Sequence, residues 1–208
     1  MNTRFPLLLA ACILGASVVA GCAGNHGAAV TTYDLGALSA PPTVTRSDAV
    51  PPRIAPITVA DVTTAPWLDS QMMYYRLSYE NDQQPRAYAV SRWSMPPPQL
   101  LGQRIKARLA QTGGAVLSGA DGAVNIALLR VEADDFSQRF STPAQSDVHV
   151  AVRASVFNGR TLVAQKSFEQ QRPAPTADAG GGASALAAAT DAMIVDLMAW
   201  LATLPEKK

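Results

Sequence analysis

The sequence predicts a single α/β domain, with a mixed, largely antiparallel sheet of about five or six strands and two main helices packed on it. Three observations support this fold class. The chain has 208 residues, which is enough for one apolar core. Several segments alternate apolar and polar residues with the period of two that strands have. Two other segments repeat apolar residues every three to four or every seven positions, as amphipathic helices do.

Residues 1–21 are expected to be a removable signal peptide. Arg4 precedes a run of 16 almost entirely apolar residues, 5–20, which is shorter than the about 20 residues that a membrane-spanning helix needs. The segment ends in Val-Ala-Gly-Cys, which resembles the lipobox of bacterial lipoproteins. That resemblance implies cleavage before Cys22 and acylation of this cysteine, and several acyl chains would anchor the protein almost permanently. The alternative is an ordinary secretory signal with a chance cysteine.

The mature chain is expected to begin with a lipidated tether and Pro-rich linker over residues 22–52, and the folded domain is expected over residues 53–208. Within the first of these segments, residues 30–36 have the character of a short strand. The paired prolines within 41–52 favour extended backbone.

Charge and cysteine content exclude two classes of structure and partner. Loss of residues 1–21 removes Arg4 and leaves 16 basic and 16 acidic side chains. Such a balance provides no basic field that could hold nucleic acid. Of the two cysteines, Cys12 leaves with the signal peptide and Cys22 carries the anchor, so no disulfide framework is expected.

The first strands are predicted in the middle of the chain. Segments 72–79 and 86–92 are rich in tyrosine and strand-like, and the polar segment 80–85 between them predicts a β-hairpin. Segment 124–133 is apolar on both parities, which indicates a central strand covered on both faces. The following Asp134 and Asp135 are interpreted as a solvated turn.

A second hairpin is predicted from residue 147 onward. Segment 147–157 alternates strictly, with valines and one alanine on one face and polar residues on the other. Asn158-Gly159 then connects it to segment 161–171, since this dipeptide favours a turn with positive φ at both central residues.

Two helices complete the domain. The first follows the prolines at 96–98 and carries Leu101, Ile105 and Leu109 at intervals of four, ahead of a Gly-Gly stop. The second, of about 20 residues, closes the chain with apolar residues seven apart. A flexible Gly/Ala loop over 173–184 is expected to precede it. Both apolar stripes are narrow enough to be used up in covering the sheet, which predicts a protein surface rather than a lipid-filled cavity as the functional part.

Neither catalytic residues nor a metal site or cofactor is predicted. The mature chain offers two histidines, His26 on the tether and His149 on the polar face of its strand, and both are interpreted as solvated. The sequence contains no nucleophile elbow, Walker loop or dinucleotide fingerprint. The glycine run at 180–182 has no neighbouring lysine and is interpreted as a linker.

The aromatic residues of the first hairpin are the candidate binding residues. Tyrosine and tryptophan are enriched at protein interfaces, although a hairpin with aromatics on both parities buries about half of them. The partner-binding candidates are Tyr74, Tyr75, Tyr79 and Tyr88. Trp93, just before the prolines, is expected to wedge between sheet and helix.

Taken together, these residues resemble the ABC-type transport auxiliary lipoprotein family. The resemblance rests on the lipobox, Tyr33-Asp-Leu, Trp67-Leu-Asp with Met73-Tyr-Tyr-Arg, Tyr88-Ala-Val-Ser-Arg-Trp-Ser-Met-Pro-Pro, and Ala199-Trp-Leu near the C-terminus. It extends over essentially the whole mature chain, with the long Gly/Ala loop as a departure from the family pattern.

The resemblance implies a non-enzymatic lipoprotein on the periplasmic face of the outer membrane. Its partners would be an MCE-type substrate-binding protein, a permease and an ATPase that together move phospholipid or another hydrophobic molecule, and it could form a homo-oligomer. Two alternatives remain open at this point. One is an envelope scaffold that activates cell-wall synthesis, and the other is a periplasmic hydrolase built around His149.

Overall fold

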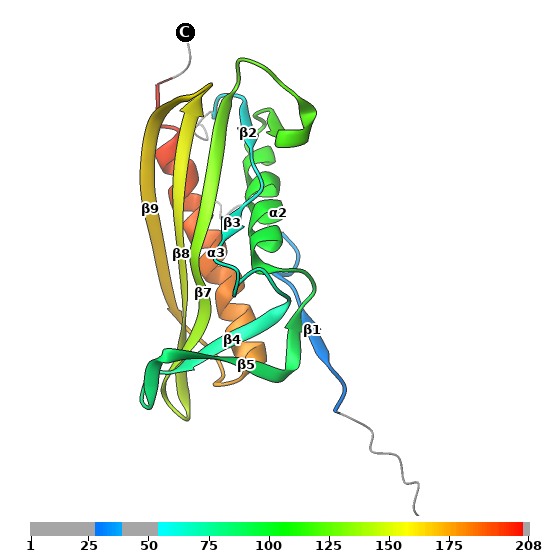
Figure 1. Cartoon of the computed structure of the whole chain (residues 1–208), viewed down its shortest axis with the longest axis vertical. Helices are drawn as coiled ribbons and strands as arrows, with labels where there is room; N and C mark the ends of the chain where they lie inside the picture. The colour runs from blue at the N-terminus through cyan, green and yellow to red at the C-terminus, as the bar shows by residue number, and fades with distance from the viewer. Residues whose placement is uncertain (1–27, 39–53, 206–208) are drawn as a thin grey trace, which may run out of the picture.

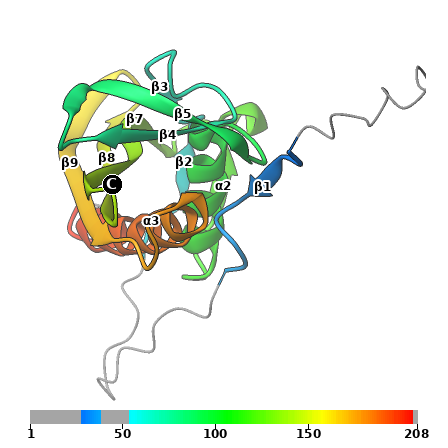
Figure 2. The same cartoon turned by 90° about the horizontal axis from the view of Figure 1, so that it is seen from below.

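The computed structural model describes residues 28–38 and 54–205, in which nine strands form one sheet that curls around helix α3 (Figures 1 and 2). Helix α2 contacts α3. The longer strands are β4 (Met72–Leu77), β5 (Asn81–Trp93), β7 (Ala127–Thr142), β8 (Gln145–Asn158) and β9 (Thr161–Pro173). The short ones are β1 (Thr31–Tyr33), β2 (Ile57–Val59), β3 (Thr63–Thr64) and β6 (Val116–Ser118), and a 3₁₀ turn, η1, spans Gly119–Asp121. The predicted fold class is confirmed, because the strands beyond the expected number have only two or three residues.

Strand β7 organises the sheet. Its 16 residues pair along one edge with β8, which in turn pairs with β9, and both pairings are antiparallel. Its other edge takes β2, β3 and β4 one after another, all parallel to it. The predicted central strand is therefore confirmed, and it is longer than the sequence pattern indicated. The predicted cover on both of its faces is wrong, because Arg130, Glu132 and Asp134 alternate with the buried residues and are exposed.

The predicted turn at Asp134 and Asp135 is wrong, because β7 continues through both residues to Thr142. The pairing register with β8 shifts between Ala133 and Asp135. Such a bulge adds one residue to the strand and reverses the inward and outward parity beyond it. As a result Asp135 points to the outer face, where it is only 8% exposed.

The alternating segment of β8 forms the inner face as predicted. Val148, Val150, Val152, Ala154 and Val156 are all buried against the core. The predicted hairpin of β8 with β9 is also confirmed, but the predicted turn with Asn158 and Gly159 as its central residues is wrong. Asn158 remains paired with Thr161, and within the turn only Gly159 has a positive φ, of 59°.

Helix α2 (Pro97–Ala110) begins with proline at its first turn, where the missing N–H has no intrahelical partner to lose. Leu101, Ile105 and Leu109 are fully buried along one side, as their spacing predicts. The predicted first hairpin is formed by β4 and β5, and β5 already begins at Asn81. Strand β1 pairs in parallel with the end of β5, so the short strand ahead of the linker belongs to the sheet.

Helix α3 (Ala179–Leu201) contradicts the predicted flexible loop over 173–184. Strand β9 reaches Pro173 and the helix begins at Ala179, so the connection is short. A Cβ on Gly181 would collide with the backbone of Thr176, and a Cβ on Gly182 would collide with the Gln138 amide. Only glycine allows this close approach, which outweighs the about 1 kcal/mol that glycine costs in a helix relative to alanine.

The apolar residues of α3 form the predicted core stripe. Leu186, Met193, Ile194 and Leu197 are fully buried against the inner face of the sheet. By length and composition alone this helix could span a membrane. In the folded domain it is the central core helix, with twelve of its residues buried.

Some predictions fall on parts of the chain outside the described residues. These are the signal peptide, the anchor at Cys22, His26 and most of the Pro-rich linker.

Candidate functional site

The four candidate tyrosines lie on the β4–β5 hairpin but do not share one surface. Tyr75 packs against Tyr88 and Phe140, with ring centroids 4.6 and 5.7 Å apart. Tyr74 contacts Trp67 in an edge-to-face arrangement at 5.3 Å. Tyr79 lies at the tip of the hairpin and is 44% exposed.

Tyr88 belongs to a hydrogen-bond network on the inner face, at the N-terminus of α3. Its hydroxyl donates to Oε1 of Gln138 over 2.9 Å, and Nε2 of Gln138 donates to the Ser146 hydroxyl over 2.8 Å. Burial raises the pKa of Tyr88 above its ordinary value, and neighbouring Tyr75 adds to the effect. Since its hydroxyl is occupied inside the protein, Tyr88 positions Gln138 rather than offering a surface for a partner.

The start of α3 is fixed by its own cap. The Asp178 carboxylate accepts a hydrogen bond from the backbone N–H of Gly181 over 2.7 Å and another from the Thr176 hydroxyl over 2.9 Å. These two hydrogen bonds hold the pKa of Asp178 below its ordinary range. This is the usual chemistry of a helix N-cap and explains the position of the helix start.

An ion-pair cluster joins the two helices. Nε and Nη2 of Arg104 donate to the two carboxylate oxygens of Asp191, each over 2.8 Å, and Arg108 Nη2 donates to Oδ2 over 2.8 Å. Partial burial alone would raise the pKa of Asp191, but the hydrogen bonds and charges of the two arginines outweigh it and lower the pKa. Sequence patterns did not indicate this cluster, because Arg104 and Asp191 are 87 residues apart.

His149 lies in a polar cluster on the outer face of β7 and β8. Its Nδ1 is 3.2 Å from Oδ2 of Asp135, which also accepts a hydrogen bond from Arg139 over 2.6 Å. The Ser137 hydroxyl donates to the other oxygen of Asp135 over 2.7 Å. The interpretation of His149 and Asp135 as solvated is wrong, since Asp135 is buried and His149 is largely buried.

This cluster does not have the geometry of a hydrolytic triad. A nucleophilic serine must hydrogen-bond to the histidine that takes its proton. Here the serine and the histidine both contact the carboxylate instead, and the buried serine could not reach a substrate. No described group of three or more His, Cys, Asp or Glu side chains could hold a metal ion.

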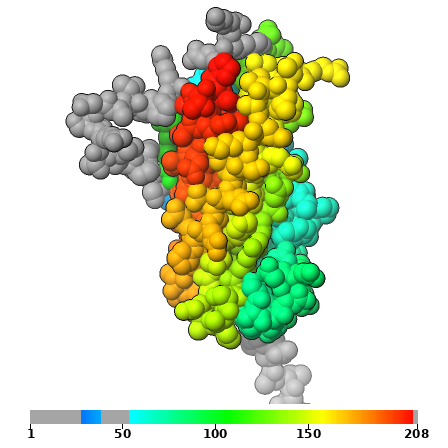
Figure 3. Space-filling view, turned by 90° about the vertical axis from the view of Figure 1, so that its left-hand side faces the viewer, coloured from blue at the N-terminus to red at the C-terminus, as the bar shows by residue number. Residues whose placement is uncertain are grey.

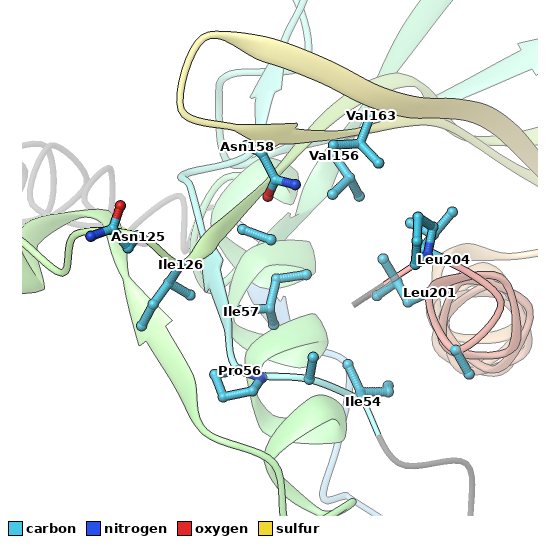
Figure 4. A pocket seen from close by; sticks show the side chains of 14 residues that line it. Ile54, Pro56, Ile57, Asn125, Ile126, Val156, Asn158, Val163, Leu201 and Leu204 are labelled. Carbon is cyan, nitrogen blue, oxygen red and sulfur yellow. The ribbon is translucent and has the colours of Figure 1, made fainter. Parts of the chain in front are cut away.

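A cavity of about 340 Å³ lies at the C-terminal end of α3 (Figure 4). Ile54, Ile57, Val156, Leu201 and Leu204 contribute apolar side chains to it. Its volume is at the lower end of the range for ligand pockets. Leu201 and Leu204 therefore line this cavity. The sequence had predicted instead that the whole apolar stripe of the last helix would pack against the sheet.

Comparison of the sequence with models of known protein families shows to which family the chain belongs. The model of the ABC-type transport auxiliary lipoprotein component matches residues 33–198. The chain belongs to this family. Membership identifies it as a lipoprotein of the cell envelope that serves an ABC-type transport system.

Solved structures support the fold of this family member. A Xanthomonas campestris protein superposes with a TM-score of 0.63 at 18% identity, over 72% of this chain and 85% of that one. An uncharacterised protein superposes with the same TM-score at 15% identity, over 83% of this chain and 98% of that one. A comparison with curated proteins gives no match.

Proposed function

We propose that this family member is a non-enzymatic lipoprotein, anchored through acylated Cys22 on the periplasmic face of the outer membrane, which docks an MCE-type substrate-binding protein. The permease and ATPase of the same system would complete the path for phospholipid or another hydrophobic molecule. The family match over residues 33–198 is the observation that carries this proposal. It is supported by the position of the lipobox, which ends only eight residues before β1 begins.

The docking surface for the MCE-type protein is narrower than the four tyrosines indicated. Tyr75 and Tyr88 pack on the inner face, so they stabilise the hairpin rather than contact a partner. Tyr79 is exposed, and Tyr74 is partly buried beside Trp67. A homo-oligomer that presents several copies of this surface is part of the proposal.

The anchor is tested by replacing Cys22 with alanine in cells supplied with labelled palmitate. We expect the wild-type chain to incorporate the label and to fractionate with the outer membrane, whereas the variant does neither. Ala23 follows the cysteine in place of an acidic residue, and acid there typically retains lipoproteins in the inner membrane. Labelling of the variant would disprove the assignment of Cys22.

The partner is tested by affinity purification from detergent-solubilised membranes. Enrichment of an MCE-type protein with its permease and ATPase supports the proposal. Enrichment of a cell-wall synthase without them would favour the scaffold alternative instead. Stoichiometric phospholipid retained by the purified monomer in native mass spectrometry would make this chain a lipid carrier in its own right.

A further inference from the structure

The segment before β4 and β4 itself carry a cluster of apolar and aromatic side chains, here called the Trp67 face, in which Trp67 and Tyr74 are partly buried against the core and Met72 is exposed. The Trp67 face consists of Trp67, Met72, Tyr74 and Arg76. The Tyr74 ring packs on Trp67, its hydroxyl lies 3.5 Å from the Met72 sulfur, and the Arg76 guanidinium lies 5.7 Å from the centre of the Trp67 ring. The segment that carries this face lies at the lower part of the molecule in Figure 3, in cyan and blue-green.

Exposed apolar side chains concentrate at this end of the protein. In the described part of the chain, seven large apolar side chains are exposed, and four of them lie on the hairpin or directly before β1. These four are Val30, Met72, Tyr79 and Val90. Apolar groups clustered on one surface indicate contact with another apolar phase or with a partner.

The register of the sheet brings the Trp67 face close to the point where the chain enters the domain. Arg92 of β5 pairs on one side with Thr32 of β1 and on the other with Met72 of β4. Neighbouring strands are about 4.8 Å apart, so Met72 lies roughly 10 Å from β1.

The chain between the anchor and β1 is short. Eight residues separate Cys22 from Thr31, and even fully extended they span only about 30 Å. An acylated Cys22 therefore keeps this end of the domain near the bilayer. The C-terminal end of α3 lies farther away, because the helix has 23 residues with a rise of about 1.5 Å each.

We propose that the Trp67 face lies against the lipid headgroups of the membrane that holds the anchor. The inference rests on the proposed function, since it requires acylation at Cys22. Tryptophan and tyrosine favour the boundary between headgroups and acyl chains. Arg76 adds a cationic group beside them, although its Nη1 already donates to the Asp82 carbonyl over 2.8 Å. This inference assigns Tyr74 to the membrane and leaves Tyr79 as the tyrosine available to the MCE-type partner.

The charges around the Trp67 face argue for apolar rather than ionic attachment. Residues 65–95 contain three acidic and three basic side chains, and Arg86 already pairs with Glu80 over 2.7 Å. A surface without net charge gains little from anionic lipid. We therefore expect the contact to persist on phosphatidylcholine vesicles and in high salt.

The three tryptophans allow a direct test with the full acylated protein. Trp67 lies on the proposed membrane face, Trp93 is buried in the core, and Trp200 lies near the far end of α3 against Phe168. Bromine-labelled lipid quenches only tryptophans close to the bilayer. On vesicles of phosphatidylcholine with dibrominated phosphatidylcholine, we expect Trp67→Phe to remove most of the quenching and Trp200→Phe to leave it unchanged.

Flotation of the vesicles separates failure of this inference from failure of the anchor. Protein that does not float with the vesicles would disprove the proposed acylation. Protein that floats but shows equal quenching with and without Trp67 would overturn the membrane contact. If Trp67 stays accessible to aqueous iodide on vesicles and is shielded only when the purified MCE-type protein is added, the face is a protein interface and the inference is also wrong.

Discussion

Gln138 and Arg139 are neighbours in β7, yet they point to opposite faces of the sheet and have very different surroundings. Gln138 on the inner face uses both ends of its amide, to Tyr88 and Ser146, and has Gly182 packed directly on it. Arg139 on the outer face bonds Asp135, while its Nε is buried without a hydrogen-bond partner within the described residues.

This difference shows at which positions the stability of the fold depends on close packing of side chains. On the inner face Gln138 has fixed partners and no room for an extra atom at Gly182, because α3 packs directly against it. On the outer face the hydrogen bonds described for the His149 cluster join residues of β7 and β8. Changes at inner positions should therefore cost much more stability than changes at outer positions.

Trp93→Ala should have the largest effect. The Trp93 side chain is 2% exposed and packs on Phe136 with ring centroids 5.4 Å apart. Truncation of a buried aromatic costs about 3–5 kcal/mol, so the melting temperature should fall sharply. Trp200→Ala, at a less buried position, is the control and should lower it less. An unchanged melting curve together with lost partner binding would place Trp93 at an interface instead.

Gly181→Ala should cause the second-largest loss of stability. The new methyl group would collide with the backbone of Thr176 and displace the start of α3. Forcing an extra carbon into packed surroundings costs about 1–3 kcal/mol in unfolding free energy. Gly180→Ala is the matched control, since its Cβ would be 3.4 Å from the nearest atom, Asp178 Oδ1. Denaturant titration of both variants checks the prediction, which is wrong if the two glycines respond alike.

Asp191→Asn should cost about 1–2 kcal/mol at neutral pH, because charge-assisted hydrogen bonds to two arginines become neutral ones at a partly exposed site. The folded state lowers the pKa of Asp191, so its contribution is present above the unfolded pKa of about 3.9 and is lost as the pH falls. The stability difference between wild type and variant should therefore shrink below about pH 4. A constant difference from pH 7 to pH 3 would exclude this linkage.

His149→Gln should have the smallest effect, within about 0.5 kcal/mol. Glutamine can still hydrogen-bond to Asp135, and the outer face does not press the side chain against a helix. Thermal unfolding and transport activity in cells should both stay near wild type. A folded variant without function would reopen the hydrolase hypothesis.

The sequence was most informative where local pattern and tertiary packing agree. The alternation in β8 and the four-residue spacing in α2 identified the buried residues correctly. Strands β2, β3 and β6 have two or three residues, which is too short for a period to be recognised.

The remaining differences have tertiary causes. The bulge after Ala133 turns Asp135 to the outer face, where it accepts hydrogen bonds from Ser137 and Arg139, and no property of the sequence around it signals the register shift. Gly181 and Gly182 disfavour a helix locally and are required only because Thr176 and Gln138 approach so closely. The split of the tyrosines between two faces needs no such cause, because Tyr74 and Tyr75 are adjacent in β4 and neighbouring strand residues point to opposite faces.

The arrangement of β7 also has a consequence for the order of folding. The pairings of β7 with β8 and of β8 with β9 come from two consecutive hairpins and close short loops, whereas the pairings of β7 with β2, β3 and β4 join segments some 60 to 70 residues apart. Local contacts cost less loop entropy and form faster than distant ones. We therefore expect the β7–β8–β9 meander to form the nucleus and the parallel strands, with β1 among them, to join it late.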